Sequence, residues 1–303
     1  MAFTVTILGS SSALPTSNRS LTAHVLNADE RFFLIDCGEG TQLQLRRFKA
    51  KLGRLDHIFI THLHGDHVLG LPGLISSLNL LGRTNDLHIY AHPDLKKILN
   101  QLLAHFFTHL NFTIVYHLLN SCSFEQIYED SKMTVHSFPL KHRIPTCGFI
   151  FRQKPRLLNI RKDMIEFYKI PVKQIYAIKC GEDYMTDEGI IIPNSSLTFE
   201  ASHPKAYAFC SDTAYNEDII PYIKDVDLLY HEATFADEDH PRAIETFHST
   251  ASQAASIARL ANAKRLVIGH FSARYKDITP LLEQARTIFP VTDAADDGLM
   301  FDI

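Results

Sequence analysis

The chain has 303 residues, of which 46% are apolar and 21% charged, with a formal net charge of −4 at pH 7. This is the composition of an ordinary globular protein, and the length suffices to bury a sizeable core. No apolar run reaches eighteen residues, which excludes a membrane-spanning helix, and the start MAFTVTILGSSSALP lacks the basic and apolar regions of a signal peptide.

The first half of the chain is dominated by β-branched and alternating apolar runs, which predict strands. We expect strands at residues 3–8, 24–26, 32–35, 57–60, 87–90, 112–116, 133–140 and 146–152. Helical periodicity is found over residues 41–52, 70–81 and 94–103.

Residues 153–195 differ in character, with many basic residues, two short helical pieces and little periodicity, and we interpret them as an inserted arm. Beyond the arm we expect strands at 206–210, 227–230 and 265–268, and helices at 250–261 and 279–289. Two runs of strands, each followed by helices, predict an α/β fold with two sheets packed face to face and helices outside. Residues 1–303 should therefore form a single αββα sandwich domain that carries the arm.

The five cysteines are scattered, odd in number and without a CxxC pair. This favours a reducing compartment, so we expect a cytoplasmic protein without a disulfide framework or a thiolate zinc site. The acidic net charge does not exclude nucleic-acid binding, because a local basic face decides that property. The informative excess is in histidine, which occurs seventeen times.

The strongest local signal is the segment THLHGDH at residues 61–67, directly after the predicted strand that ends at Ile60. Imidazole and carboxylate groups are ligands of zinc, and Gly65 allows a tight turn around a metal. The alternatives are an exposed polar loop and a histidine tag. A tag would be terminal, and chance rarely places HxHxDH between a buried strand and a helix. The segment therefore predicts a metal site.

Three further ligand-type residues follow predicted strands, namely His142, Asp212 and His270. Alone, each is more often a capping aspartate or a structural histidine. Strand ends meet at one edge of a sheet, however, and together with the cluster these residues supply enough ligands for two metals.

The segments around these residues resemble the metallo-β-lactamase superfamily, and their extensions resemble ribonuclease Z. The similar segments are LGSSSALPTSNRS at 8–20, THLHGDHVLGLPGL at 61–74, HEATF at 231–235, HST at 248–250 and GHFSARY at 269–275. HxHxDH alone specifies only the superfamily, whereas the extended set is far more specific.

The resemblance implies that His62, His64 and His142 hold one zinc, that Asp66, His67 and His270 hold a second, and that Asp212 bridges them. It also implies an αββα sandwich, a homodimer, and an endoribonuclease that removes the 3′ trailer of tRNA precursors and leaves a 3′-hydroxyl. The family's arm usually carries a glycine- and proline-rich tip with a GP pair. The corresponding YKIPVKQ at 168–174 lacks that pair, so the mode of tRNA binding is open.

Two zinc ions can acidify a bridging water and neutralise phosphoryl charge, and the family assigns Asp66 to orienting or deprotonating that water. His248 is our candidate for protonating the departing 3′ oxygen or for hydrogen-bonding the phosphate. It also lies at a helix start, beside the N-cap residues Ser249 and Thr250. We expect Glu232 to orient His248 and His231 to be structural.

Substrate contacts are expected from Arg274 and Tyr275 near the metals, although a surface salt bridge is nearly as good an interpretation. The arm contributes Lys169 and Lys173 among its basic residues, with Tyr168 and Tyr176 as stacking surfaces. A second basic run, Arg46 to Arg54, is equally well explained as a solvated helix face.

Two rival functions stay open. One is another hydrolase on the same scaffold, such as a phosphodiesterase of small molecules. The other is a metal-bearing RNA-binding protein without turnover. Manganese and iron also accept histidine and aspartate ligands, so the sequence does not fix the metal.

Overall fold

The computed structural model describes residues 2–107 and 109–303. They divide into two compact units. The larger unit comprises the chain up to Tyr128 together with Val135–Phe151 and Lys205–Ile303, and the smaller comprises Glu129–Thr134 and Arg152–Pro204. No helix in the described part of the chain is both long and apolar enough to cross a membrane.

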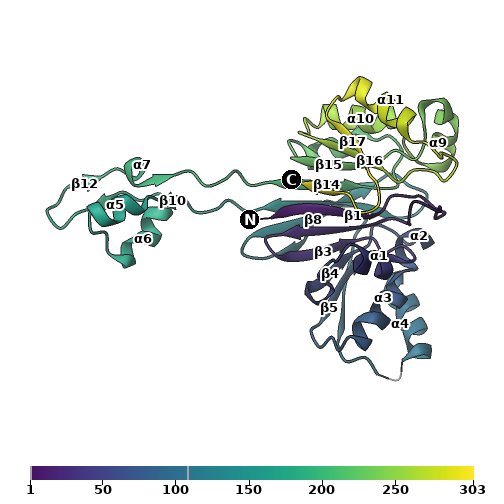
Figure 1. Ribbon diagram of the computed structural model, residues 1–303, viewed down its shortest axis with the longest axis horizontal. Coiled ribbons are helices and arrows are strands. Elements are labelled where there is room, and N and C mark those ends of the chain that lie inside the picture. The colour runs from purple at the N-terminus through teal and green to yellow at the C-terminus, as the bar shows by residue number, and fades with distance from the viewer. Residues whose placement is uncertain (1, 108) are drawn as a thin grey trace. The chain divides into compact units, whose positions relative to one another are not determined.

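Two seven-stranded sheets form the larger unit (Figure 1). The first has the order β18-β1-β2-β3-β4-β5-β6, and its strands are β1 Phe3–Gly9, β2 Ala23–Ala28, β3 Arg31–Ile35, β4 Leu55–Phe59, β5 Leu87–Ala91, β6 Ile114–Leu118 and β18 Met300–Asp302. The second has the order β17-β16-β15-β14-β9-β8-β7, and its strands are β7 Glu125–Glu129, β8 Met133–Leu140, β9 Thr146–Gln153, β14 Ala206–Cys210, β15 Leu228–Glu232, β16 Leu266–Gly269 and β17 Thr292–Ala294.

Each sheet contains four consecutive parallel strands, β3 to β6 in the first and β14 to β17 in the second. Parallel neighbours end at the same edge of a sheet, and this edge is where loops gather functional side chains.

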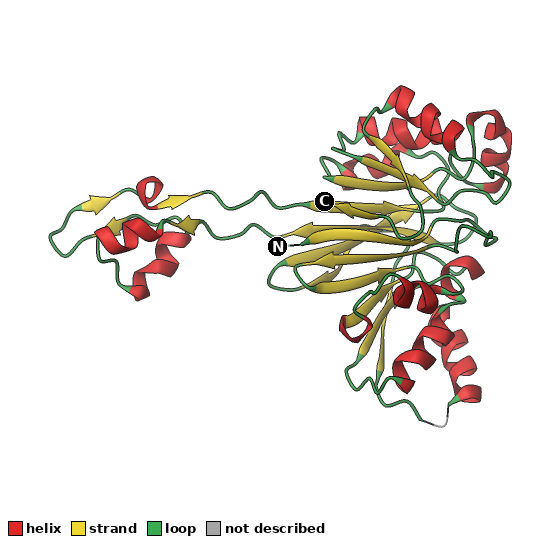
Figure 2. Cartoon of the chain, in the orientation of Figure 1, coloured by secondary structure: helices red, strands yellow, loops and turns green. Residues whose placement is uncertain are grey.

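Helices cover the outer face of each sheet (Figure 2). The helices of the larger unit are α1 Thr41–Arg47, α2 Gly65–Val68, α3 Leu71–Leu80, α4 Asp94–Phe106, α8 Ile220–Ile223, α9 His240–Thr246, α10 Ala251–Leu260 and α11 Thr279–Ile288, with short 3₁₀ turns at Leu52–Arg54, Glu217–Ile219 and Asp237–Asp239. Buried leucines and isoleucines of α1, α3 and α4 pack on the first sheet, and buried alanines and leucines of α10 and α11 pack on the second.

Phenylalanine rings fill the space between the two sheets. The ring centroids of Phe59 on β4 and Phe151 on β9 lie 5.4 Å apart, and Phe33 on β3 lies 5.6 Å from Phe151. These rings belong to opposite sheets, so the inner faces interdigitate as in a packed sandwich. The predicted α/β fold class with two packed sheets is confirmed.

Several element bounds differ from the sequence prediction. The helix expected over 41–52 ends at Arg47, because Lys49 adopts a left-handed backbone with φ of 55° and closes the helix. The strand expected at 112–116 is β6, shifted by two residues, and the marginal strands β7, β17 and β18 were not predicted. Their short or half-exposed segments lack the apolar pattern on which the prediction rests.

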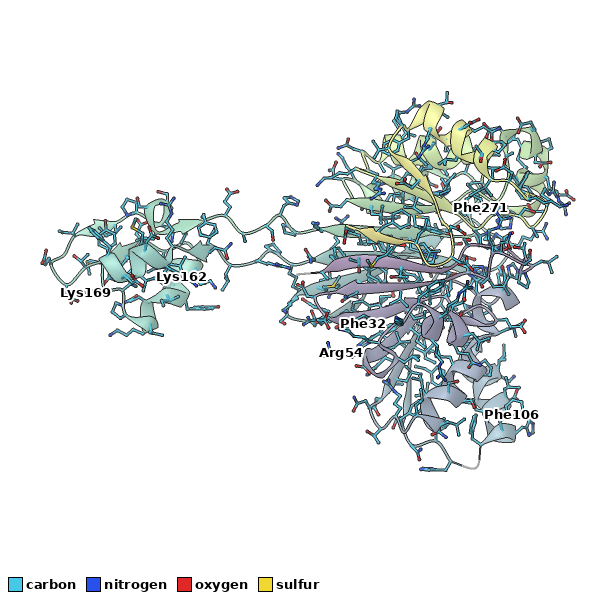
Figure 3. All side chains as sticks on the ribbon, viewed as in Figure 1. Phe32, Arg54, Phe106, Lys162, Lys169 and Phe271 are labelled. Carbon is cyan, nitrogen blue, oxygen red and sulfur yellow. The ribbon has the colours of Figure 1, made fainter. Side chains whose placement is uncertain are left out.

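The smaller unit has its own apolar core. Its elements are β10 Asn159–Ile160, α5 Lys162–Phe167, α6 Val172–Lys179, β11 Tyr184–Met185, β12 Ile191–Ile192, α7 Asn194–Leu197 and β13 Thr198–Phe199. Strand β10 pairs with β13, and β11 pairs with β12. Five buried residues, among them Ile178 and Leu197, hold these pieces together, and Lys162 and Lys169 lie on the surface of the unit (Figure 3).

Candidate metal centre

Strand ends position the candidate ligands. His62, His64, Asp66 and His67 follow β4, and His142, Asp212 and His270 follow β8, β14 and β16. Asp212 and His270 have φ values of 60° and 59°, a left-handed conformation that side-chain-bearing residues seldom adopt. Such backbone strain is concentrated at functional sites, because the surrounding structure must hold it in place.

One group of ligand atoms comes from His62, His64, His142 and Asp212. Nδ1 of His64 lies 3.0 Å from Nε2 of His62 and 3.3 Å from Nε2 of His142. Oδ2 of Asp212 lies 3.5 Å from His62 Nε2 and 3.7 Å from His142 Nε2. A tetrahedral zinc with bonds of about 2.05 Å separates its ligand atoms by roughly 3.3 Å, so this group fits one zinc.

A second group comes from Asp66, His67 and His270. Oδ2 of Asp66 lies 3.5 Å from His67 Nε2 and 3.6 Å from His270 Nε2. Oδ1 of Asp212 lies 3.3 Å and 3.0 Å from the same two nitrogens. Within the described residues, Nε2 of His67 and Nε2 of His270 are buried and have no hydrogen-bond partner. A buried lone pair left unpaired in this way fits coordination of a cation.

Asp212 joins the two groups. Its Oδ2 faces the first group and its Oδ1 faces the second. A carboxylate can bridge two cations in this arrangement, with one oxygen on each.

Hydrogen bonds from the opposite ring nitrogens fix the orientation of three imidazoles. Nδ1 of His67 donates to Asp36 at 2.8 Å, and Nδ1 of His142 donates to the carbonyl of Phe247 at 3.0 Å. Nδ1 of His62 donates to the Thr61 hydroxyl at 3.0 Å, and that hydroxyl donates to Asp36. Each ring is thereby held with its Nε2 lone pair free for a metal.

Thr234 performs the same task on the other side of the centre. Its hydroxyl donates to Oε2 of Glu232 at 2.6 Å and accepts from Nδ1 of His270 at 3.0 Å. Thr61 and Thr234 are therefore equivalent links, each connecting a buried carboxylate to a candidate metal-binding imidazole.

The protein groups alone leave an excess of negative charge. Burial lowers the pKa of His67, but the carboxylates of Asp212, Asp36 and Asp66 outweigh it and raise that pKa well above its ordinary value. Burial raises the pKa of Asp212, yet the surrounding histidines, His270 foremost, hold it well below its ordinary value. Divalent cations would supply the positive charge that balances these carboxylates, and would displace any proton from Nε2 of His67.

His248 stands beside the candidate ligands. Its Nδ1 donates to Oε1 of Glu232 at 2.8 Å, and its side chain is 15% exposed. Burial lowers the pKa of His248, but the Glu232 carboxylate raises it, and the net value is about 9. The fully buried Glu232 also accepts the backbone N–H of Thr213 at 2.8 Å, so its position is fixed. His248 could also form a smaller ligand group with Asp212 and His270.

A pocket of about 510 Å³ opens onto the centre. Its wall includes five of the candidate ligands and His248, together with the loop from Ser12 to Pro15. The backbone N–H of Ala13 in this loop donates to Oδ2 of Asp66 at 2.8 Å. The loop thus shapes the pocket and also holds a candidate ligand.

The other predicted residues are not among those that line this pocket. Arg274 pairs with Asp239 at 3.0 Å, the Tyr275 hydroxyl also donates to Asp239, and neither residue lines the pocket. Lys169 and Lys173 are exposed residues of the smaller unit. In the basic run, Lys51 and Arg54 are both paired with Glu30. His231 donates its Nδ1–H to the backbone carbonyl of Glu232 and belongs to no candidate ligand group among the described residues.

Sequence reasoning missed the residues that orient the ligands. Asp36 directly follows β3, so the strand-end signal that singled out Asp212 was available for it too. Thr61 and Thr234 carry no comparable signal, because buried threonines are common and only their three-dimensional partners distinguish these two.

Comparisons with known proteins place these features in context. A family model described as "Anti-Pycsar protein Apyc1" matches residues 3–286. The chain is 48% identical to "Ribonuclease Z" of Parabacteroides distasonis, over 99% of both chains. It is 50% identical to "Ribonuclease Z" of Phocaeicola vulgatus, over 99% of this chain and 97% of that protein.

Solved structures agree with this similarity. Human tRNase Z, short form, is 28% identical and superposes with a TM-score of 0.71 over 98% of both chains. The metallo-β-lactamase fold protein YhfI of Bacillus subtilis is 17% identical, with a TM-score of 0.70 over the full length of both chains. The second similarity concerns the fold alone.

Proposed function

The chain belongs to the ribonuclease Z family and, over residues 3–286, to the family described as Anti-Pycsar protein Apyc1, and from this premise we propose that it removes the 3′ trailer of tRNA precursors with two bound zinc ions. It is an endoribonuclease, which hydrolyses phosphodiesters. His62, His64 and His142 would hold one zinc, Asp66, His67 and His270 the other, and Asp212 would bridge them.

One observation carries the proposal. Two ligand groups joined by Asp212 contribute to the wall of one pocket, which His248 also lines while its Nδ1 is paired with the buried Glu232. Hydrolysis of a phosphodiester needs an activated water, neutralisation of phosphoryl charge and a proton for the departing oxygen. When bound, the two ions supply an acidified water and the charge neutralisation. The pair supplies the proton.

The protein's own groups divide the remaining work. Asp66, held by the Ala13 N–H, orients the attacking water and accepts its proton. The water oxygen bonds to phosphorus as the bond from phosphorus to the 3′ oxygen of the tRNA breaks. His248 stays protonated at neutral pH because Glu232 stabilises its cationic form, and it gives the proton to the departing 3′ oxygen. The products are a tRNA with a 3′-hydroxyl and a trailer with a 5′-phosphate.

The smaller unit is proposed as the inserted arm that contacts tRNA within a single-domain enzyme. Arg161, Lys162, Lys169 and Lys173 are exposed and have no ion-pair partner among the described residues. Tyr176 is 70% exposed, whereas Tyr168 packs against the unit's core. Unpaired cations beside an exposed ring suit phosphates and unstacked bases. The other proposed substrate contacts are Arg274 and Tyr275.

We further propose a homodimer that works in the cytoplasm. All five cysteines are free thiols, as a reducing compartment requires.

The proposal is tested with zinc-loaded protein and a tRNA precursor of defined 3′ trailer, alongside bis(p-nitrophenyl) phosphate. We expect a single cut at the trailer junction that leaves a 3′-hydroxyl on the tRNA. Hydrolysis of the small diester with the precursor left intact would instead favour a small-molecule phosphodiesterase. Binding of the precursor without any hydrolysis would favour a non-catalytic RNA-binding protein.

A further inference from the structure

A second cavity, of about 500 Å³, adjoins the loop that shapes the catalytic pocket. The loop lines the catalytic pocket with Ser12 to Pro15, and its next four residues, Thr16 to Arg19, line the second cavity. Tyr275, Lys276 and Asp296 also line this cavity. The two cavities are therefore separated by one turn of the same short segment.

Arg19 is the unusual residue of this cavity. It is only 9% exposed, and its guanidinium lies 5.7 Å above the ring of Phe271, which Figure 3 labels. The guanidinium makes one hydrogen bond within the described residues, to the backbone carbonyl of Tyr275, and no carboxylate among those residues pairs with it. The other four of its five N–H donors thus have no partner in the described part of the chain.

A second arginine whose side chain is largely covered, Arg83, provides the comparison. The Arg83 side chain is 6% exposed and pairs with Asp56 at 2.6 Å. Arginine is rarely buried without a counter-charge, because an uncompensated cation in the protein interior is costly. Arg83 obeys this rule with a carboxylate of the protein. Arg19 lacks such a group, and it borders a cavity that an anion can enter.

The surroundings hold Arg19 in place and leave the local charge positive. The Thr16 hydroxyl accepts the backbone N–H of Asn18 and of Arg19, and the Thr16 N–H donates to the Arg19 carbonyl at 2.9 Å. Lys276 is exposed and has no ion pair in the described part of the chain. The carboxylate of Asp296, which also lines the cavity, accepts the Asp297 N–H at 2.9 Å. Two cations thus face one carboxylate.

We propose that this cavity binds a backbone phosphate of the RNA strand near the scissile bond, with Arg19 as its principal ligand and Lys276 at its rim. The proposal rests on the proposed function, which places an RNA strand in the adjoining pocket. An RNA strand repeats its phosphate at every nucleotide, so a strand that passes Pro15 presents another anion to this cavity. The planar, multiply donating guanidinium suits phosphate oxygens.

The test measures the coupling between Arg19 and individual phosphates. The zinc-loaded protein is titrated with precursor RNA that carries a neutral methylphosphonate at the scissile position, and binding is followed by fluorescence anisotropy without turnover. A second methylphosphonate is then moved along the strand. The variants are Arg19→Gln and Lys276→Gln, with Lys97→Gln on the exposed face of α4 as the matched control.

We expect Arg19→Gln to weaken binding on the order of tenfold and Lys276→Gln severalfold, with Lys97→Gln unchanged. The slope of log Kd against the logarithm of the salt concentration should fall by about 0.7 for each lost phosphate contact. At one position along the strand, neutralising the phosphate should weaken binding to the wild type. The same methylphosphonate should not further weaken binding to the Arg19→Gln variant. That non-additivity identifies the bound phosphate.

The proposal is overturned if both variants bind every RNA as the wild type does, or if their losses add to those of every methylphosphonate. It is also overturned if Arg19→Gln lowers the melting temperature and binding together while Lys276→Gln has no effect, since Arg19 would then be structural only. Cleavage of unmodified precursor by the wild type is scored separately. A wild type that binds but does not cleave overturns the proposed function and leaves the phosphate test valid.

Discussion

Replacing His248 by alanine should slow precursor cleavage by about 10²- to 10⁴-fold while both zinc ions stay bound. The loss corresponds to roughly 3 to 5 kcal/mol of transition-state stabilisation, at about 1.4 kcal/mol for each tenfold change. His248 uses its Nδ1 for Glu232, so its Nε2 is free to protonate the departing oxygen, and the two main ligand groups are complete without it. Glu232 keeps three of its hydrogen bonds in the variant, so the fold should persist.

Two measurements on the same preparation decide the outcome. Single-turnover cleavage at saturating protein gives the rate of the chemical step, and elemental analysis gives zinc per chain. His105→Ala, at an exposed position of α4, serves as the control. A fall from two zinc ions to one would show that His248 is a ligand, in the smaller group with Asp212 and His270. A rate loss below tenfold with both metals present would remove it as the proton donor.

Three further predictions follow from the geometry. The single-turnover rate should fall as pH rises through about 9, because His248 loses its proton there. Glu232→Gln removes the largest contribution that raises the pKa of His248, so this fall should move to lower pH. A pH–rate profile in which it does not move contradicts the pairing. Loading metal-free protein with zinc near pH 7 should release protons, because the carboxylates around His67 hold the pKa of this histidine well above its ordinary value. Calorimetry in buffers of different ionisation enthalpy measures this release, and the absence of any release refutes the prediction. Thr234→Val should weaken zinc binding by about 10- to 100-fold in a chelator competition, because His270 loses the hydroxyl that orients it. Thr287→Val, at an exposed site, is the matched control. Equal zinc affinity of the two variants would show that the Thr234 hydroxyl is dispensable.

The sequence singles out the candidate ligands because their positions follow a simple rule. His142, Asp212 and His270 each lie just beyond an apolar strand. Buried strands are the elements of this chain that are most easily predicted from the sequence. Parallel strands bring such positions to one edge, so a one-dimensional pattern becomes a three-dimensional cluster.

The orienting contacts are beyond that rule. The hydroxyl of Thr234 connects Glu232 to His270, which lies 36 residues away from the threonine, and nothing local in the sequence specifies such a pairing. The charge balance around His67 likewise depends on three carboxylates from separate segments. Arg19 is similar, because its lack of a counter-charge emerges only once every carboxylate has been placed.

Contacts with the substrate are the hardest to predict from the sequence, for a different reason. Arg274 is basic and close in sequence to His270, yet it pairs with Asp239 and lies above the ring of Phe235 at 5.1 Å. A basic residue near a site can be solvated, pair with a carboxylate or bind a phosphate. The sequence does not distinguish these three roles.

The most direct test of the metal centre is anomalous diffraction at the zinc edge from crystals of the zinc-loaded protein. Two peaks should appear, one on each side of the Asp212 carboxylate, with His62, His64 and His142 around the first and Asp66, His67 and His270 around the second. A single peak, or peaks outside this ring of side chains, would contradict the proposed two-metal centre.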